Sequence, residues 1–349
     1  MKTYRLALIG FGNVGQGLAQ IIRDRGPKLA DRFGLTLDIV AVTTLSRGAV
    51  YDPKGLNPGR LLAAMAEAGT LADVPAPFDG WDARQTIAGS NADIVVETSY
   101  SDLQTGEPAA GHIRLALEQG RPVVTANKGP IALHYRELAD LAARAAPEVR
   151  LGFEGTVMSG TPALQLALDN LTGAGIREIK GILNGTTNYI LTQMENGLTY
   201  DAALAEAQRL GYAEADPSAD VEGFDAAGKV VILGNVLLNA GLTMDRVACT
   251  GITGLTPTDI DQARQAGERW KLIGQLRSTG NDLSASVKPM RLPLSHPLAG
   301  VMGVTNAITY STDLLGDVTL IGPGAGGLET GYALLNDILA IHRRLGGER

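Results

Sequence analysis

The feature that most constrains the fold is a glycine pattern near the N-terminus. Residues 10–15 form a G-x-G-x-x-G sequence, preceded by the apolar run 6–9 and followed by a helical apolar pattern at 18–22. Glycine lets a strand turn tightly into a helix and lets the backbone approach a pyrophosphate, which the helix N-terminus attracts. The pattern therefore predicts a dinucleotide-binding turn. Its six residues are our first cofactor-binding candidates: Gly10, Phe11, Gly12, Asn13, Val14 and Gly15.

The periodicity that follows predicts an α/β domain with a Rossmann-type, doubly wound parallel sheet. Apolar runs at 37–42, 94–96 and 122–124 alternate with helical patterns at 111–119 and 132–145. Strands that alternate with helices in this way pair in parallel, and helices cover both faces of the sheet.

The pattern changes after about residue 150, where helices follow one another with strands between them. The expected helices are 162–171, 188–195, 200–210 and 225–239, and the expected strands are 176–183, 286–292, 307–311 and 318–321. We predict a first domain of residues 1–150 and a second, α+β domain of residues 151–322 with a mixed sheet. A final helix within 323–345 would pack back on the first domain. Helices on one face of the second sheet would leave its other face for a homodimer partner.

Composition narrows the class of protein. A net charge of -7 and a pI near 5.2 argue against binding to nucleic acid or to an anionic membrane, because such binding needs clustered Lys and Arg. Cys249 is the only cysteine, so the chain forms no internal disulfide, and no apolar stretch is long enough to span a membrane. We expect a cytoplasmic protein that acts on a small molecule.

Residues that follow three of the predicted strands are further cofactor candidates. No carboxylate stands in residues 42–47 and Arg47 is nearby, so this loop could bind a 2′-phosphate; Arg47 could equally be a solvated loop residue. Thr98 and Ser99 could bond the nicotinamide half of the cofactor or cap their turn. Lys128 could meet a substrate carboxylate or a cofactor oxygen, or be a solvated lysine.

An acid-rich stretch, residues 211–225, holds five carboxylates and runs into a helix that contains Lys229. Asp225 and Lys229 are four residues apart, so they share one face of this helix, which is otherwise apolar. Two interpretations remain open. The pair is either a structural ion pair or part of a partly buried site in which loss of water favours the neutral amine as a proton acceptor.

Five segments of the chain match one known family. They are residues 10–15, 125–130, 181–191, 211–229 and 322–327, of which the third and fourth are the most specific. Over nearly its whole length the chain resembles the homoserine dehydrogenases. The resemblance implies an oxidoreductase that interconverts L-homoserine and L-aspartate 4-semialdehyde with NAD or NADP, in threonine and methionine biosynthesis. Many members continue into a regulatory ACT domain, and we expect this chain to be a short form without one.

The resemblance also implies roles for individual residues. Lys229 matches the family's proton-transferring lysine, and Lys128 matches its partner near the nicotinamide. Gly326 joins the cofactor-binding candidates. The residues that match substrate-binding positions are Glu214, Asp220, Asp225, Gly185, Thr186 and Tyr212.

Residues 154–162 match a family segment that wraps a monovalent cation, Na+ or K+, with backbone oxygens. Met158 and Thr161 depart from the more glycine-rich form of this segment. The alternative is a packed turn before a helix. The ligands that the resemblance implies are Glu154 and the carbonyl oxygens of Val157, Ser159 and Thr161.

Two other functions compete with this one. A phosphorylating semialdehyde dehydrogenase needs an activated cysteine, whereas Cys249 has no histidine near it in the sequence. A nucleotide-sensing regulatory protein would keep the cofactor fold without catalysis. The joint presence of Lys128, Glu214, Asp225 and Lys229 argues against such a protein.

Overall fold

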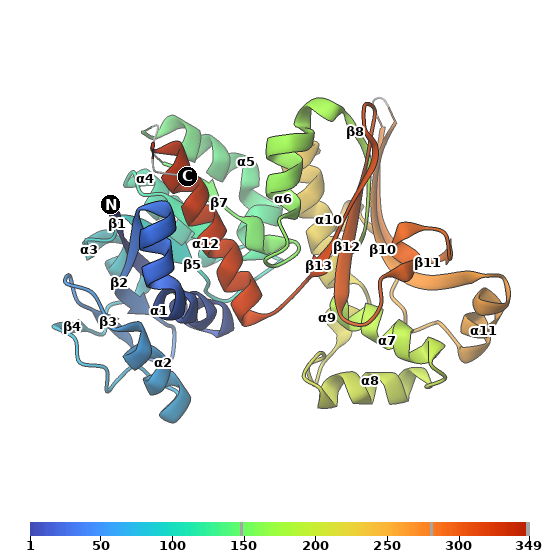
Figure 1. The fold of residues 1–349 in the computed structure, drawn as a ribbon, viewed down its shortest axis with the longest axis horizontal. Coiled ribbons are helices and arrows are strands. Elements are labelled where there is room, and N and C mark those ends of the chain that lie inside the picture. Colours follow the sequence, from blue (N-terminus) through green and yellow to red (C-terminus); the bar gives the residue numbers. More distant parts are fainter. Residues whose placement is uncertain (147–148, 280–281, 347–349) are drawn as a thin grey trace. The chain divides into compact units, whose positions relative to one another are not determined.

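The computed structural model describes residues 1–146, 149–279 and 282–346, which belong to two compact units (Figure 1). The first unit comprises Met1–Gly160 with Gly326–Arg349, and the second comprises Thr161–Ala325. The sequence placed the division near residue 150. It falls later because Leu151–Gly152 pairs with the first sheet as its last strand.

The first unit contains a seven-stranded sheet in the order β4-β3-β2-β1-β5-β6-β7. Five neighbouring strands, from β2 to β7, pair in parallel, and β3 and β4 add an antiparallel edge. This arrangement confirms the predicted Rossmann-type sheet. The strands are β1 (Lys2–Ile9), β2 (Leu35–Thr43), β3 (Ala49–Tyr51), β4 (Phe78–Asp79), β5 (Ile94–Glu97), β6 (Val123–Thr125) and β7 (Leu151–Gly152). The helical segments are α1 (Asn13–Phe33), α2 (Pro58–Glu67), α3 (Ala83–Gly89), α4 (Ala109–Glu118), α5 (Lys128–Arg144), η1 (Glu154–Thr156) and α12 (Gly327–Arg344).

The C-terminal helix α12 packs against α1 within the first unit (Figure 1). The two helices cross at positions that are occupied by glycine. A Cβ atom on Gly17 would overlap the carbonyl of Gly327, and one on Gly331 would overlap the backbone of Gly17. The backbones of α12 and α1 therefore approach each other closely. The first residues of α12 lie beside the glycine turn.

The second unit contains a six-stranded mixed sheet in the order β13-β12-β8-β10-β11-β9, in which only the pair of β11 and β9 is parallel. The strands are β8 (Ile176–Ile182), β9 (Ala248–Cys249), β10 (Glu268–Thr279), β11 (Asp282–Pro293), β12 (Thr305–Thr312) and β13 (Gly316–Pro323). The helical segments are α6 (Ala163–Leu166), η2 (Ala167–Leu171), η3 (Thr172–Ala174), α7 (Gly185–Glu195), α8 (Tyr200–Arg209), α9 (Ser218–Val221), α10 (Phe224–Leu237), η4 (Met244–Arg246), α11 (Pro257–Gln265) and η5 (Pro297–Gly300).

Helices α6 and α10 cover one face of this sheet (Figure 1). The hydroxyl of Tyr310 on β12 donates to the carbonyl of Ala163 on α6, and a Cβ atom on Gly274 of β10 would lie 2.9 Å from Val230 on α10. Side chains alternate along a strand, so Gln275 points to the opposite face. None of the helices in the described part of the chain combines the length and the hydropathy needed to cross a membrane.

Candidate active site

The glycine turn between β1 and α1 has the geometry that a dinucleotide requires. Gly10 has a φ of +99°, and a Cβ atom there would overlap the carbonyl of Thr98. A Cβ atom on Gly15 would lie 2.9 Å from the carbonyl oxygen of Gly10. A Cβ atom on Gly12 would meet no described atom within 4 Å. The first and third glycines therefore close the turn, and the second leaves space for a pyrophosphate to approach the backbone.

Two further candidates border this turn in different ways. Phe11 is only 2% exposed and its side chain packs in the hydrophobic core, so the side chain does not face a cofactor. Gly326 caps the N-terminus of α12, and a Cβ atom on the next residue, Gly327, would lie 2.7 Å from the carbonyl oxygen of Asn13. The structure thus brings the 326–327 segment next to the first residue of α1.

Arg47 lies in a tight loop after β2. Thr44 closes the loop by donating its N–H and its hydroxyl to the carbonyl of Gly48, at 3.1 and 2.8 Å. The N–H of Arg47 donates to Oγ1 of Thr44 at 2.8 Å. The Arg47 side chain is exposed and forms no ion pair with any residue that the structure describes. Its guanidinium is therefore available to an anion.

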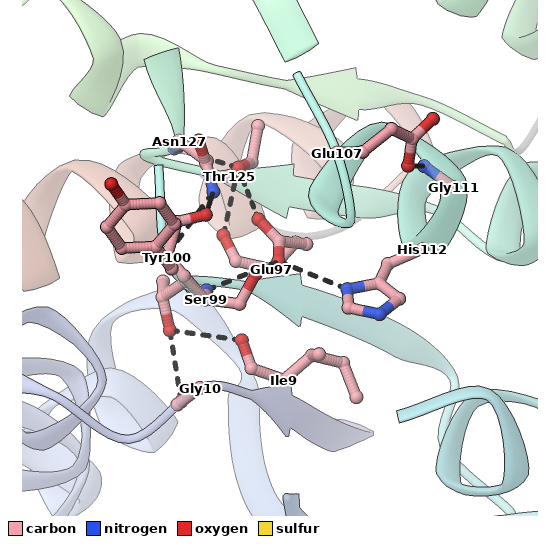
Figure 2. A network of polar contacts seen from close by, with 11 residues as sticks. Ile9, Gly10, Glu97, Ser99, Tyr100, Glu107, Gly111, His112, Thr125 and Asn127 are labelled. Carbon is pink, nitrogen blue, oxygen red and sulfur yellow. Dashed lines mark hydrogen bonds and ion pairs between the residues drawn. The ribbon is translucent and has the colours of Figure 1, made fainter. Parts of the chain in front are cut away.

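Thr98, Ser99 and Lys128 follow the carboxyl ends of β5 and β6, which are neighbours in the sheet. The side-chain amide of Asn127 joins the two segments by donating to the carbonyl oxygens of Ser99 and Tyr100, at 3.3 and 2.9 Å (Figure 2). Lys128 is the first residue of α5 and is partly exposed. Ligands of open α/β sheets bind at this edge.

In the second unit, Asn184 forms hydrogen bonds with two of the predicted acids, Asp220 and Asp225, and Lys229 contacts the second of them. Nδ2 of Asn184 donates to Oδ1 of Asp220 at 2.6 Å and to Oδ2 of Asp225 at 3.0 Å. Nζ of Lys229 donates to the same Asp225 oxygen at 2.8 Å and to the carbonyl of Leu183 at 2.6 Å. This acid–lysine cluster, Asn184, Asp220, Asp225 and Lys229, joins the N-cap of α7, helix α9 and the first turns of α10.

The electrostatics of this cluster suit a cationic ligand group. Burial raises the pKa of Asp220, and the negative charge of Asp225 adds to the rise, while the hydrogen bond from Asn184 opposes it. Two carboxylates face one lysine, so the cluster carries an excess negative charge when both acids are ionised. A substrate ammonium would neutralise that excess.

The remaining substrate candidates are arranged around α7. The hydroxyl of Thr186 donates to the carbonyl of Tyr212 at 2.6 Å, and the Tyr212 ring packs edge-on against Tyr189 at 5.1 Å. Gly185 begins α7, where a Cβ atom would lie 2.7 Å from the carbonyl oxygen of Val304. Glu214 is exposed, and its carboxylate has no partner among the described residues. The structure therefore brings together every predicted substrate residue of this group except Glu214.

The predicted cation turn is only partly contained in one unit. Glu154 is 2% exposed, and its N–H donates to Oδ2 of Asp337 at 3.0 Å. Ser159 has a φ of +53°, a left-handed conformation that a residue with a side chain seldom adopts. Val157 belongs to the same unit, whereas Thr161 opens the second. Within the described residues, no group of three or more His, Cys, Asp or Glu side chains could hold a metal ion.

The structure also reveals site residues that were not predicted. Asn184 stands directly before the helical pattern of α7 and accepts from the N–H of Thr187 at 2.9 Å, as an N-cap does. An asparagine before a helix was a visible signal for this position. The contacts of Asn184 with Asp220 and Asp225 had no such signal, because they join residues 36 and 41 positions apart.

The geometry at Cys249 weakens the competing cysteine mechanism. Its thiol is 3.3 Å from the carbonyl oxygen of Glu222, to which it donates. Burial, and then the charge of Glu222, raises the pKa of this thiol. A catalytic cysteine needs a lowered pKa.

A dinucleotide-binding unit combined with a unit that holds an acid–lysine cluster defines an NAD(P)-dependent oxidoreductase that acts on an alcohol group. Residues 10–151 match the model described as "Homoserine dehydrogenase, NAD binding domain", and residues 162–339 match the model described as "Homoserine dehydrogenase". The chain belongs to the homoserine dehydrogenase family. This confirms the resemblance found in the sequence.

Individual proteins support this assignment over the full chain. An NAD(+)-dependent homoserine dehydrogenase from Pseudomonas canavaninivorans is 47% identical over 98% of this chain and 97% of its own length. A homoserine dehydrogenase structure from Thiobacillus denitrificans has a TM-score of 0.84 and 33% identity, and the match covers 99% of this chain and 74% of that one. A hyperthermophilic archaeal homoserine dehydrogenase in complex with NADPH has a TM-score of 0.82, 30% identity and full coverage of both chains.

Proposed function

We propose that the acid–lysine cluster carries out the homoserine dehydrogenase reaction in this chain, the interconversion of L-homoserine and L-aspartate 4-semialdehyde. The observation that carries the proposal is the contact of Lys229 with Asp225 beside Asp220, because it places a proton-transferring amine next to acids that can hold an ammonium. A nicotinamide, when bound, supplies the hydride acceptor or donor. The chain supplies proton transfer and recognition of the amino-acid group.

The mechanism divides substrate binding and proton transfer among these residues. Asp220 and Asp225 receive the substrate ammonium, and Glu214 adds a third carboxylate from its exposed position. Lys229 takes the hydroxyl proton when the alcohol is oxidised and returns a proton in the reverse direction. Lys128 receives the substrate carboxylate or a cofactor oxygen. The backbone of Gly185 and Thr186, together with Tyr212, completes the substrate contacts.

An absorbance assay tests the reaction directly. We expect NAD(P)H to form when the purified chain is mixed with L-homoserine and oxidised cofactor. A simple diol of similar length should be a poor substrate, because it lacks the ammonium that the two acids recognise. Absence of any homoserine-dependent cofactor reduction with either NAD+ or NADP+ would refute the proposed function.

For the cofactor, we propose that NADP(H) binds at least as well as NAD(H). The support is the loop after β2, which offers the exposed Arg47 and has no carboxylate to repel a 2′-phosphate. The relatives include one named as NAD(+)-dependent and one solved with NADPH, so both cofactors occur among similar proteins. Titration of both cofactors checks the proposal. A preference of more than about tenfold for NAD(H), with NADP(H) affinity unchanged in Arg47→Ala, would contradict it.

We also propose that the 154–161 turn binds Na+ or K+ through Glu154 and the carbonyl oxygens of Val157, Ser159 and Thr161. The support is the left-handed backbone at Ser159, which turns successive peptide groups in an unusual direction. Oxygen ligands of this kind suit hard cations. The thermal midpoint should rise with added Na+ or K+ but not with a bulky organic cation at equal ionic strength. Equal midpoints in all three salts would contradict the site.

The proposed enzyme is a cytoplasmic homodimer. The cytoplasmic location is supported by the single cysteine, Cys249, which excludes an internal disulfide. Cell fractionation against a cytoplasmic marker tests it, and recovery of the protein in another compartment would contradict it.

A further inference from the structure

A fully buried carboxylate, that of Glu97, lies next to the proposed nicotinamide contacts at the end of β5 (Figure 2). Polar groups surround it. The N–H of Ser99 donates to Oε1 at 3.2 Å, and the hydroxyl of Ser99 contacts the same oxygen. Nδ1 of His112 lies 3.5 Å from Oε1, and Oγ1 of Thr125 lies 3.5 Å from Oε2. The mechanism above gives this carboxylate no task.

Glu97 fixes the direction of the Ser99 hydroxyl. A carboxylate accepts hydrogen bonds and cannot donate them, so the Ser99 proton points toward Glu97. The remaining lone pairs of Oγ are then left for a ligand, and Ser99 is partly exposed. The neighbouring Thr98 has the same polarity, because its hydroxyl donates to the carbonyl of Gly10 at 3.0 Å. Both hydroxyls therefore present acceptors.

The backbone of Ser99 is held from the other side as well. Nδ2 of Asn127 donates to the carbonyl oxygens of Ser99 and Tyr100 (Figure 2). The hydroxyl of Thr125 donates to the carbonyl of Glu97 at 2.9 Å and also accepts from the N–H of Asn127 at 2.9 Å. With its N–H, hydroxyl and carbonyl all engaged, Ser99 has little freedom to reverse its polarity.

We infer that Glu97 is a positioning residue that makes Ser99 an obligate hydrogen-bond acceptor for the carboxamide N–H of the nicotinamide. A carboxamide turned the other way would point its carbonyl oxygen at the lone pairs of Ser99, so one orientation is favoured. A nicotinamide analogue without N–H donors would lose the same contact. This inference rests on the proposed placement of the nicotinamide at Thr98 and Ser99.

The test compares two ligands that differ only at this group: NAD+ and its 3-acetylpyridine analogue, in which a methyl group replaces the amide nitrogen. We expect the whole protein to bind NAD+ about three- to tenfold more tightly than the analogue, the range of one hydrogen bond. Ser99→Ala should bring the ratio of the two Kd values close to one. Glu97→Gln should do the same, because a glutamine amide leaves the Ser99 hydroxyl free to reverse.

The double variant Glu97→Gln/Ser99→Ala separates positioning from general damage. If Glu97 acts through Ser99, the double variant has the same Kd ratio as Ser99→Ala alone. A residue that only supports the fold would weaken both ligands equally and leave the ratio unchanged. Asp93→Asn is a matched control, because Asp93 stands before the same strand, binds Arg5 and is distant from the carboxyl edge.

Each outcome is decisive. Ratios that fall in Glu97→Gln and in Ser99→Ala, without further change in the double variant, support the inference. A ratio that stays at the parent value in Glu97→Gln overturns it while Ser99 remains a cofactor contact. A ratio unaffected by Ser99→Ala overturns the proposed nicotinamide placement, and the inference with it.

Discussion

Two buried lysines in the second unit show that burial alone does not identify a catalytic amine. Lys271 is 1% exposed, and its Nζ donates to Oδ1 of Asn188 at 2.9 Å and contacts the carbonyl of Val301. Burial lowers the pKa of Lys271 to about 8. Lys271 thus links Asn188 on α7 to the loop that contains Val301, which is a structural role. Lys229 differs because its amine contacts a carboxylate, Asp225, in a cluster with a second acid.

Replacement of Lys229 distinguishes proton transfer from a structural ion pair. Lys229→Ala should lower kcat by about 10² to 10⁴ and leave cofactor affinity nearly unchanged, as expected for a lost acid–base group. Lys229→Arg keeps the positive charge opposite Asp225 but does not release a proton at working pH, so it should be as inactive as the alanine variant. Steady-state kinetics measure both. An arginine variant with near-parental kcat would assign Lys229 to structure.

Removing the charge of Asp220 should raise the stability of the protein and lower its activity. The pKa of Asp220 is raised in the folded chain, so the folded state keeps a proton that the unfolded state releases near pH ~4. Stability from this group is therefore greatest below that pH and falls as pH rises through the raised value. At neutral pH the ionised form is a net cost of the site, which Asp220→Asn removes.

We expect Asp220→Asn to raise the thermal midpoint by about 2–4 °C at pH ~8 and by less at pH ~4.5. KM for L-homoserine should rise at least about tenfold, because a charged hydrogen bond to the ammonium is lost. Thermal unfolding at both pH values and steady-state kinetics check these outcomes. A variant that is less stable than the parent at pH ~8 would show that the Asp220 charge supports the fold.

The sequence could predict site residues that are close in the chain or belong to family motifs. It could not predict most of the contacts between residues that are distant in the chain. The four-residue spacing of Asp225 and Lys229 was visible, and the structure shows their contact. The contact of Glu97 with His112 had no signal in the sequence, because it joins the end of strand β5 to helix α4. The buried side chain of Phe11 was hidden in the same way, since a glycine-turn motif does not specify packing.

At the scale of elements, long periodic segments were predictable and short or interrupted ones were not. Helices α7 and α10 appear where the apolar spacing placed them, within a few residues, whereas α1 extends well beyond the apolar pattern at 18–22. The brief edge strands β3 and β4 carry too few residues to show a period. Strand β10 was missed because Lys271 occupies one of its buried positions, and its partners on other segments satisfy its charge.

The crossing of α1 and α12 gives a prediction for an element. Gly17→Ala should destabilise the first unit by about 3 kcal/mol, near the upper end for overpacked sites, because its Cβ atom would overlap backbone atoms that cannot rotate away. Cofactor affinity should also fall, since Gly327 lies against Asn13 in the glycine turn. Thermal unfolding and cofactor titration measure the two effects.

Gln20→Ala is the control for this prediction, because Gln20 lies on the exposed face of the same helix. It should change stability by no more than about 0.5 kcal/mol. If Gly17→Ala proved as stable as Gln20→Ala, close approach of the two helices would not be required.

For the whole molecule, the second sheet has a face opposite α6 and α10, on which Leu298 of η5 and Asn188 of α7 pack against β10. Paired positions on five strands form a row of polar side chains across this face, opposite α10. The row consists of Thr319, Thr309, Lys180, Gln275 and Ser286. A neighbouring apolar row, which includes Ile182 and Ile273, packs against Leu298 of the η5 segment. The polar row has small hydroxyl side chains at three of its five positions, which permits a second sheet to pack closely against it.

We therefore expect a homodimer formed through this face, with the two sheets related by a twofold axis. Light scattering at micromolar concentration should return twice the chain mass of 36.5 kDa. Ser286→Arg places a long charged side chain in the row and should shift the protein toward monomer, whereas Gln265→Arg, on the exposed end of α11, should leave the mass unchanged. A parent protein that is monomeric at this concentration would contradict the assembly. A dimer that survives Ser286→Arg would place the interface on another surface.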